Sequence, residues 1–294
     1  SSAASDVYKR QVIPIALRRG DTVNKERYLK YLTLVEESLD GVFSGLRDCP
    51  AVLKESMRYT VTAGGKRIRP VLLLGAVDAM GGDVNKALPL ADAVELIHTY
   101  SLIHDDLPCM DNDDIRRGKI ANHLKFGEAV ALLAGDALLT LAFELAGNAV
   151  AGGCDPRVVS VIAEYAGYAG MIGGQADELS GGEMNEERLL AIERNKTGRM
   201  LQLPLALAAL ICAEKRDLFD AFAEQFGILF QTMDDLSDRT EKVSSNAVLF
   251  FGCREAKARA ESAFAACVEC LKELPYDTSF LEYVVRMIAG KDEN

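Results

Sequence analysis

The sequence predicts an all-α fold, and three observations support this prediction. Apolar residues recur at helical spacing along most of the chain, and no segment alternates apolar and polar residues over a useful length. The composition is 49% hydrophobic with few aromatic residues and no Trp, an ordinary globular balance that is rich in Ala and Leu. No linker or repeat of fixed period divides the 294 residues, so we expect one large domain.

Glycine, proline and hydrophobic periodicity place the expected helices along the chain. The first covers residues 24–39, the second opens at Cys49–Pro50 and ends before Gly64–Gly65, and the third starts at Pro70. Proline suits that first position because its fixed φ is helical and its missing N–H would have no helical partner. Later helices are expected over residues 84–107, 127–150, 158–179, 186–194, 200–212, 215–238, 255–274 and 279–288.

Charge and cysteine usage exclude several classes of function. The net charge of −11 argues against nucleic acid as the main partner, because a phosphate backbone needs a basic surface. The seven cysteines are scattered and lack the two CxxC pairs of a zinc site, so we expect a reducing, cytoplasmic environment. No apolar run reaches the roughly 18 residues of a membrane span, so we expect no such span.

The expected helix over residues 84–107 ends in carboxylates, which is unusual for a buried helix. Carboxylates repel one another, and the helix macrodipole adds partial negative charge at the same end. Divalent metal would offset this charge, and all-oxygen ligands suit Mg²⁺, which often bridges carboxylates to phosphate oxygens. Two arginines nearby would then bind the phosphates through bidentate hydrogen bonds. The aspartates are Asp105, Asp106, Asp111, Asp113 and Asp114, and the arginines are Arg116 and Arg117.

A basic stretch, GGKRIRP over residues 64–70, predicts an anion site at the start of a helix. The glycine pair lets the backbone turn, and the helix N-terminus supplies free N–H groups. A solvated basic turn is the alternative. His98 lies two helical turns before Asp105 on the same face, so we expect it to face the phosphates as a donor. The three cations of the stretch are Lys66, Arg67 and Arg69.

A second acidic group occurs where the helix over residues 215–238 ends. Its polar residues recur at i, i+3, i+4 and i+7 and so share one face among apolar residues. One such group alone would indicate a frayed, solvated helix end. Two acidic helix ends together with two basic stretches favour a cavity between them. The residues of the second group are Gln231, Asp234, Asp235 and Asp238.

These motifs resemble those of the trans-isoprenyl diphosphate synthases, the family of farnesyl and geranylgeranyl diphosphate synthases. The resemblance covers residues 24–288 in order, with GGKRIRP, DDLPCMD followed by RRG, KTG at residues 196–198, and FQTMDDLSD. It implies an isoprenoid synthase-type helical bundle around a central active-site cavity, a homodimer, and a reaction of ionisation, condensation and elimination. Residues 1–23 would then be an N-terminal tail, and residues 24–294 a single polyprenyl synthase domain.

The resemblance also implies a role for each motif residue. About three Mg²⁺ ions, or Mn²⁺ in their place, would hold the allylic diphosphate, which is dimethylallyl or geranyl diphosphate. Arg116 and Lys196 would contact this diphosphate, and Thr197 and Gln231 would point oxygen dipoles at the allylic cation. The implied metal ligands are Asp105, Asp106, Asp111, Asp234, Asp235 and Asp238. The implied ligands of isopentenyl diphosphate are Lys66, Arg69, His98 and Arg117.

Product length depends on the floor of the cavity, where we expect an aromatic ring. Tyr100 lies five residues before Asp105, roughly 7–8 Å below the carboxylates at a rise of about 1.5 Å per residue. With Ser101 beside it, and with Pro108 and Cys109 as two extra residues inside the motif, the pattern resembles the bacterial-type farnesyl diphosphate synthases. We therefore expect (E,E)-farnesyl diphosphate as the product.

Two places depart from the family pattern, and three alternatives stay open. Glu193 stands where the family often has His, and the loop over residues 239–246 is shorter than usual, with Lys242 in place of the family lysine. The first alternative is another product length, above all geranylgeranyl diphosphate. The second is a terpene cyclase, against which GGKRIRP argues because a cyclase binds no second diphosphate. The third is a non-catalytic subunit of a heteromeric synthase, which would normally lack an acidic motif.

Overall fold

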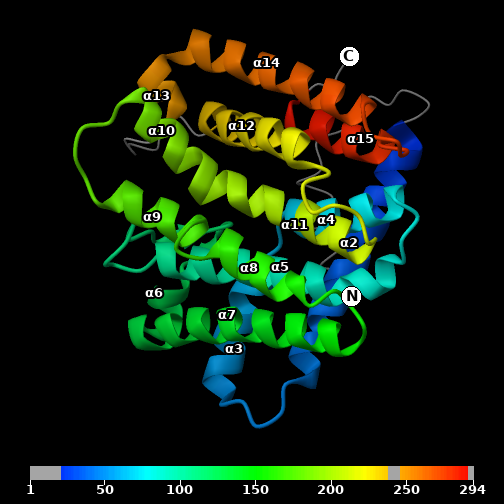
Figure 1. Cartoon of the computed structure of the whole chain (residues 1–294). Helices are drawn as coiled ribbons and strands as arrows, with labels where there is room; N and C mark the ends of the chain where they lie inside the picture. The colour runs from blue at the N-terminus through cyan, green and yellow to red at the C-terminus, as the bar shows by residue number, and fades with distance from the viewer. Residues whose placement is uncertain (1–20, 238–245, 291–294) are drawn as a thin grey trace.

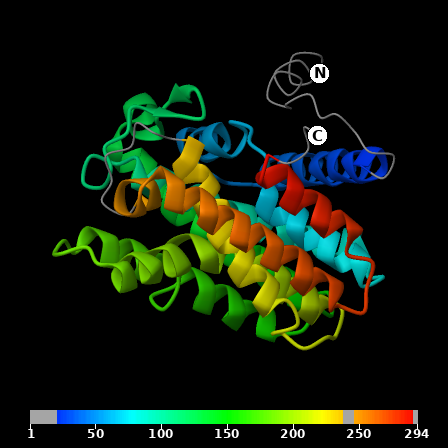
Figure 2. The ribbon, with the colours of Figure 1, turned by 90° about the horizontal axis from the view of Figure 1, so that it is seen from above.

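The structure is a computed structural model that describes residues 21–237 and 246–290, and it confirms the all-α prediction. Figure 1 shows the helices arranged as a bundle, and Figure 2 shows the same bundle from above. The helices are α2 (Asp21–Gly45), α3 (Ala51–Val61), α4 (Ile68–Ala79), α5 (Val84–Asp105), α6 (Asn122–Phe126), α7 (Glu128–Ala151), α8 (Arg157–Ala166), α9 (Met171–Leu179), α10 (Glu186–Ile192), the π-helical turn η1 (Glu193–Gly198), α11 (Arg199–Ile211), α12 (Asp220–Ser237), α13 (Ala247–Phe251), α14 (Cys253–Lys272) and α15 (Ser279–Ile288).

Helix α5 forms the centre of the bundle, where it packs against α4, α7 and α11. Most of its residues are buried, because a helix that is apolar nearly all round is stable only when neighbours cover its faces. Helix α12 packs against α14, η1 and α11 on another side of the bundle. One continuous apolar core includes residues from α2 to α15. The domain limits at residues 24 and 294 stay a prediction.

Several helix boundaries differ from those expected. Helix α4 begins at Ile68, so Pro70 lies inside its first turn, where N–H groups still have no helical partner. The expected helix over residues 158–179 is split into α8 and α9. The break lies at Gly167 to Gly170, where a Cβ on Gly170 would come within 2.0 Å of the Tyr165 carbonyl oxygen. Helix α2 extends beyond the expected range at both ends, and α5 ends at Asp105 instead of residue 107.

A short hairpin corrects the expectation that the chain has no sheet. Strand β1 (Ile115–Arg116) pairs antiparallel with β2 (Lys119–Ile120). Both turn residues are left-handed, Arg117 with φ +52° and Gly118 with φ +72°, as a two-residue hairpin turn requires. Strands of two residues are too short to show an alternating pattern in the sequence. The hairpin places Arg116 and Arg117 beside the end of α5.

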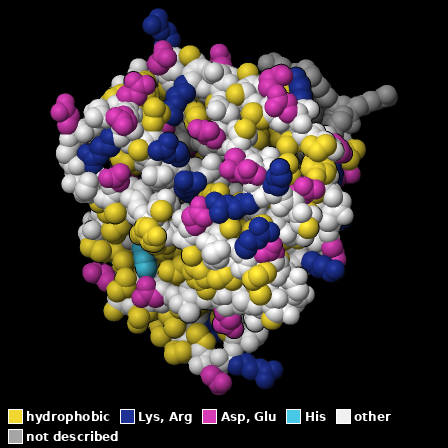
Figure 3. Space-filling view, in the orientation of Figure 1, with side chains coloured by type: hydrophobic (Ala, Val, Ile, Leu, Met, Phe, Trp, Pro, Cys, Tyr) yellow, Lys and Arg dark blue, Asp and Glu magenta, His cyan; other side chains and the backbone are white. Residues whose placement is uncertain are grey.

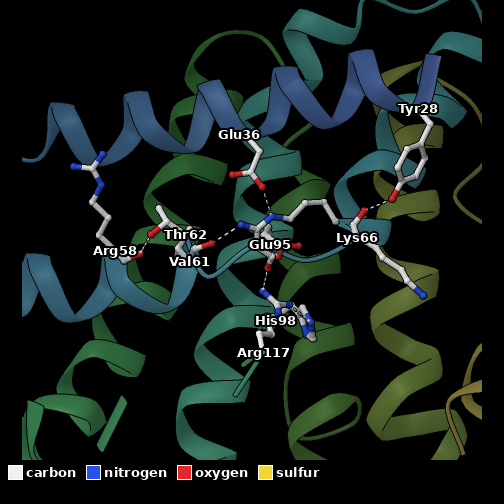
Figure 4. Close-up of polar contacts among 11 residues, drawn as sticks. Tyr28, Glu36, Arg58, Val61, Thr62, Lys66, Glu95, His98 and Arg117 are labelled. Carbon is white, nitrogen blue, oxygen red and sulfur yellow. Dashed lines mark hydrogen bonds and ion pairs between the residues drawn. The ribbon is translucent and has the colours of Figure 1, made fainter. Parts of the chain in front are cut away.

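Arg67 does not join an anion site, because it is buried in ion pairs that fasten the start of α4. Its Nε donates to Glu36 at 2.7 Å, its Nη1 donates to Glu95 at 2.6 Å, and its Nη2 donates to the Val61 carbonyl. Burial alone would lower the pKa of Arg67, but Glu95 and Glu36 raise it above its ordinary value. Figure 4 shows these partners, which come from α2, α3 and α5. Arg67 therefore joins the start of α4 to α2, α3 and α5.

We predict that Arg67→Met lowers the free energy of unfolding by about 3–5 kcal/mol, because it leaves Glu95 buried without its cation. Chemical denaturation of the purified variant measures this change. The matched control is Arg254→Met, an exposed arginine on α14, which is expected to stay within about 0.5 kcal/mol of the parent. Equal stability of the two variants would contradict the structural role of Arg67.

Candidate active site

A cavity of ≈ 940 Å³ has walls from α5, α9, η1 and α12. In Figure 3, acidic and basic side chains gather over the middle of one face of the molecule. Two expected residues, Asp106 and Lys66, do not line the cavity, and Asp238 lies outside the described residues. The expected residues that line it are Arg69, His98, Tyr100, Ser101, Asp105, Asp111, Arg116, Arg117, Lys196, Thr197, Gln231, Asp234 and Asp235.

The first acidic group folds back on itself after α5. The Asp111 N–H donates to the Asp105 carbonyl at 2.9 Å, so the chain brings the two carboxylates to one end of the cavity. Burial raises the pKa of Asp105 to about 6, an effect that Lys196 opposes and the charge of Asp111 reinforces. Burial likewise raises the pKa of Asp111. These carboxylates are therefore held in ionised form at a cost that a bound cation would offset.

Asp106 is tied to Arg116 instead of facing the cavity. It is 1% exposed, and its Oδ1 accepts hydrogen bonds from Arg116 Nε at 2.8 Å and Nη2 at 2.5 Å. The same guanidinium reaches Asp113 Oδ2 at 2.8 Å. An arginine that satisfies two carboxylates in this way holds the loop of the first motif in place. Its predicted contact with diphosphate would require it to exchange partners.

The second acidic group faces the cavity through α12. Asp235 accepts hydrogen bonds from Gln231 Nε2 at 2.8 Å and from the Ala247 N–H at 2.7 Å. Burial raises the pKa of Asp235, although the bond from Ala247 lowers it. Asp235 thus holds the start of α13 against α12, while Asp234 is the more exposed carboxylate of the pair. Helix α13 lies in a part of the chain for which no element was expected.

Three basic residues from separate elements meet in the cavity: Arg69 from α4, His98 from α5 and Arg117 from the hairpin. The Arg117 Nη1 donates to the Gly64 carbonyl at 2.7 Å, and its Nη2 lies 3.5 Å from His98 Nε2. A Cβ on Gly65 would come within 3.1 Å of the Arg117 guanidinium, so the glycine pair also makes room for this arginine. Burial, together with the arginines nearby, lowers the pKa of His98 well below its usual range, so the ring is neutral.

Arg69 differs from Arg67 because its half-buried guanidinium has an unused donor. Its Nε is buried without a hydrogen-bond partner, and its guanidinium lies 5.9 Å from the centre of the Phe230 ring. Burial lowers the pKa of Arg69 to about 10. A partly buried cation of this kind is costly unless an anion binds to it. Lys66, by contrast, is exposed, and in Figure 4 its side chain extends away from Glu36 and Glu95.

The structure adds residues of α9 that sequence reasoning missed. The Lys196 Nζ donates to Glu178 Oε2 at 2.5 Å, and Glu178 lines the same cavity as Asp105 and Asp111. Both amide atoms of Gln175 are buried without a hydrogen-bond partner. The signal was present in the sequence, since these residues stand at i and i+3 in GGQADEL, on one face of an apolar helix.

Aromatic rings from α5 line part of the cavity. Tyr100 is 4% exposed and lines the cavity, and its ring lies edge-on to His104 with centroids 5.6 Å apart. The His104 Nε2 lies 3.0 Å from the Leu132 carbonyl of α7. A Cβ on Gly135 would come within 2.1 Å of the same ring nitrogen, so α5 and α7 pack closely only because residue 135 is glycine. Leu139 of α7 lines the same cavity.

The donor set fits a divalent metal, although the described side chains are not arranged around one. Within residues 21–237 and 246–290, no three His, Cys, Asp or Glu side chains converge on a single metal position. The cavity nevertheless carries carboxylate oxygens on two walls, and burial raises the pKa of several of them. Carboxylates of this kind suit Mg²⁺, which keeps some of its water and binds through one or two protein ligands and substrate phosphates.

Comparison with known proteins gives consistent likenesses. Residues 50–247 match the family model described as polyprenyl synthetase. The chain is 42% identical over 267 residues to the farnesyl diphosphate synthase of Geobacillus stearothermophilus. This alignment covers 83% of this chain and 90% of that protein. It is 45% identical over 221 residues to the chloroplastic heterodimeric geranylgeranyl pyrophosphate synthase large subunit 1 of Arabidopsis thaliana. This second alignment covers 71% of this chain and 59% of that longer protein.

A solved structure shows the same architecture. The geranyltransferase of Legionella pneumophila superposes with a TM-score of 0.84 at 28% identity, over 92% of this chain and 98% of that one. The helical bundle implied by the sequence motifs is therefore confirmed.

We predict that Arg69→Met weakens the binding of inorganic diphosphate by about tenfold or more, because a charge-assisted hydrogen bond is lost. The free energy of unfolding should not fall, because the variant removes a partly buried charge that lacks a full set of partners. Calorimetric titration and chemical denaturation measure the two quantities, with Arg254→Met as the control. Undiminished diphosphate binding would show that the basic group serves another purpose.

Proposed function

The chain belongs to the polyprenyl synthetase family and is a trans-prenyltransferase, and from this premise we propose that it makes (E,E)-farnesyl diphosphate. Its substrates would be isopentenyl diphosphate and an allylic diphosphate, dimethylallyl or geranyl diphosphate. The likeness to a bacterial farnesyl diphosphate synthase over most of both chains supports this proposal. The observation that carries it is that Tyr100 lines the cavity as a buried aromatic ring.

Tyr100 is a buried side chain that would obstruct a growing product. Its hydroxyl is buried without a hydrogen-bond partner, and burial together with the charge of Asp105 raises its pKa to about 12. The ring is held by His104, which α7 holds in turn. A growing isoprenoid chain that extends from the acidic groups along α5 would meet this ring about one and a half helical turns below them.

The two diphosphates would bind to different groups of residues. We assign isopentenyl diphosphate to the basic group of Arg69, His98 and Arg117, with Lys66 as a ligand that would have to move toward the cavity. We assign the allylic diphosphate to Arg116 and Lys196. When bound through the aspartates of the two acidic motifs, divalent metal would supply Lewis-acid stabilisation of the leaving diphosphate.

The residues around the allylic carbon would stabilise charge without attacking it. Thr197 and Gln231 line the cavity and present oxygen dipoles, and the buried apolar side chain of Met171 would help to exclude water from the hydrocarbon. Arg116 and Lys196 would hold the released diphosphate close to the condensed product. That diphosphate would then accept the proton lost in the elimination step.

Geranylgeranyl diphosphate is the second candidate product, and the plant relative of that specificity favours it. The cavity floor separates the two candidates, because a longer product needs space beyond Tyr100. A non-catalytic role in a heteromeric synthase stays the third possibility, and the acidic residues on both walls argue against it.

We also propose a homodimer that uses the outer face of α7. By length and composition this is the one described helix that would be apolar enough to cross a membrane, and 39% of its most apolar window is buried. One such helix is weak evidence of a span in a helical bundle.

The exposed residues of α7 include Leu132 and Leu133, and in Figure 3 apolar side chains cover the lower part of the face. A monomeric mass in analytical ultracentrifugation would contradict the dimer.

We predict that the protein with Mg²⁺, isopentenyl diphosphate and geranyl diphosphate ends its reaction at farnesyl diphosphate, and that Tyr100→Ala extends the product. The substitution removes the ring and opens space below the acidic groups. Chromatography of the dephosphorylated products measures their chain length. The matched control is Tyr100→Phe, which keeps the ring and should keep the product. Unchanged products from Tyr100→Ala would refute the role of the Tyr100 ring in limiting product length. No product from the parent protein would refute the proposed function.

A further inference from the structure

Glu193 places a negative charge in the wall of a cavity that we propose to hold diphosphates. It begins η1, three residues before Lys196, and lines the cavity with 8% of its surface exposed. Burial raises the pKa of Glu193, although its hydrogen bonds with Arg259 oppose that rise. A carboxylate at this position repels phosphate oxygens unless a cation offsets its charge.

Arg259 of α14 supplies that cation from behind the wall. Its Nη1 and Nη2 donate to the two carboxylate oxygens of Glu193 at 3.2 and 2.5 Å. The two side chains are only 16% and 7% exposed, so little solvent screens the pair. The Arg259 guanidinium also lies 5.6 Å from the centre of the Phe251 ring. Arg259 itself is not among the residues that line the cavity.

The same arginine lies between the two segments that carry the predicted allylic site. Glu193 belongs to η1, which also contains Lys196 and Thr197. Phe251 belongs to α13, whose first residue donates its N–H to Asp235. The contacts of Arg259 therefore join the Lys196 segment to the helix that holds the second acidic group.

We propose that Arg259 is a positioning residue for prenyl transfer, which neutralises Glu193 and so keeps the η1 wall able to accept the allylic diphosphate. The inference rests on the proposed function, because it names a determinant of the same site. Arg259 acts through Glu193 and does not touch the substrate. Its loss would leave an uncompensated carboxylate in the wall, which is worse for an anionic ligand than the absence of both groups.

A cycle of variants separates charge neutralisation from simple support. In Arg259→Met, the KM for geranyl diphosphate should rise by about tenfold, because Glu193 is left buried and unpaired. Glu193→Gln alone should change this KM by less than about threefold, because it removes the repelling charge itself. The double variant Glu193→Gln/Arg259→Met should return close to the value of Glu193→Gln. Arg259→Lys, which keeps the charge, should retain most of the parent's affinity.

Two controls define the result that would overturn the proposal. The KM for isopentenyl diphosphate should change by less than about twofold in every variant, because its group comes from α4, α5 and the hairpin. Arg254→Met, on the same helix as Arg259, should match the parent. A double variant as impaired as Arg259→Met, or an equal rise of both KM values, would show that Arg259 merely supports the fold and would refute neutralisation.

Measurements of folding and of diphosphate binding test neutralisation even if a variant is unstable or inactive. If Arg259→Met does not fold but the double variant does, the unpaired Glu193 is the cause and the proposal holds; if neither folds, it fails. If the parent protein makes no prenyl product, the proposed function fails separately. Calorimetric titration of the same variants with inorganic diphosphate and Mg²⁺ then tests neutralisation directly. Weaker binding in Arg259→Met that the double variant restores supports it, and weaker binding in both refutes it.

Discussion

Carboxylates from the C-terminal ends of two helices, α5 and α12, line one cavity, where partial burial disfavours their ionised forms. Burial is the largest cause that raises the pKa of Asp105 to about 6, and it raises the pKa of Asp235 as well. The rest of the site follows from this constraint, because every buried carboxylate needs a cation or a donor nearby. The protein meets the need with arginines and a lysine drawn from elements that are far apart in the sequence.

Several predicted substrate ligands have carboxylate partners within the protein. Arg116 is paired with Asp106, and Lys196 is paired with Glu178. Arg69 is different, because its Nε is buried with no partner. This arrangement implies an exchange on substrate binding, in which metal takes over the carboxylates and diphosphate takes over the cations. Each ligand would then prepare the site for the other.

Much of the site could be predicted from the sequence because most of its charged residues lie in short motifs. Asp105 and Asp111, Asp234 and Asp235 all reach the cavity from the expected segments. The different fates of Arg67 and Arg69 could not be predicted, because they depend on Glu36 and Glu95 from distant helices. The Glu178 partner of Lys196 and the Arg259 partner of Glu193 were missed for the same reason.

The fold, too, was predictable where it depends on helical periodicity and unpredictable elsewhere. Helical periodicity located the long helices, whose apolar faces the bundle buries. It could not show that the chain breaks between α8 and α9, where a Cβ on Gly170 would clash with the Tyr165 carbonyl oxygen. The hairpin was too short for any pattern, although its turn is what presents Arg117 to the cavity.

The most direct test of charge exchange is the coupling between Mg²⁺ and inorganic diphosphate. Calorimetric titration with diphosphate, with and without saturating Mg²⁺, measures this coupling, provided that the direct association of the two ions in solution is subtracted. We predict that each ligand strengthens the binding of the other by about tenfold or more, a typical allosteric coupling. Independent binding of Mg²⁺ and diphosphate would contradict charge exchange.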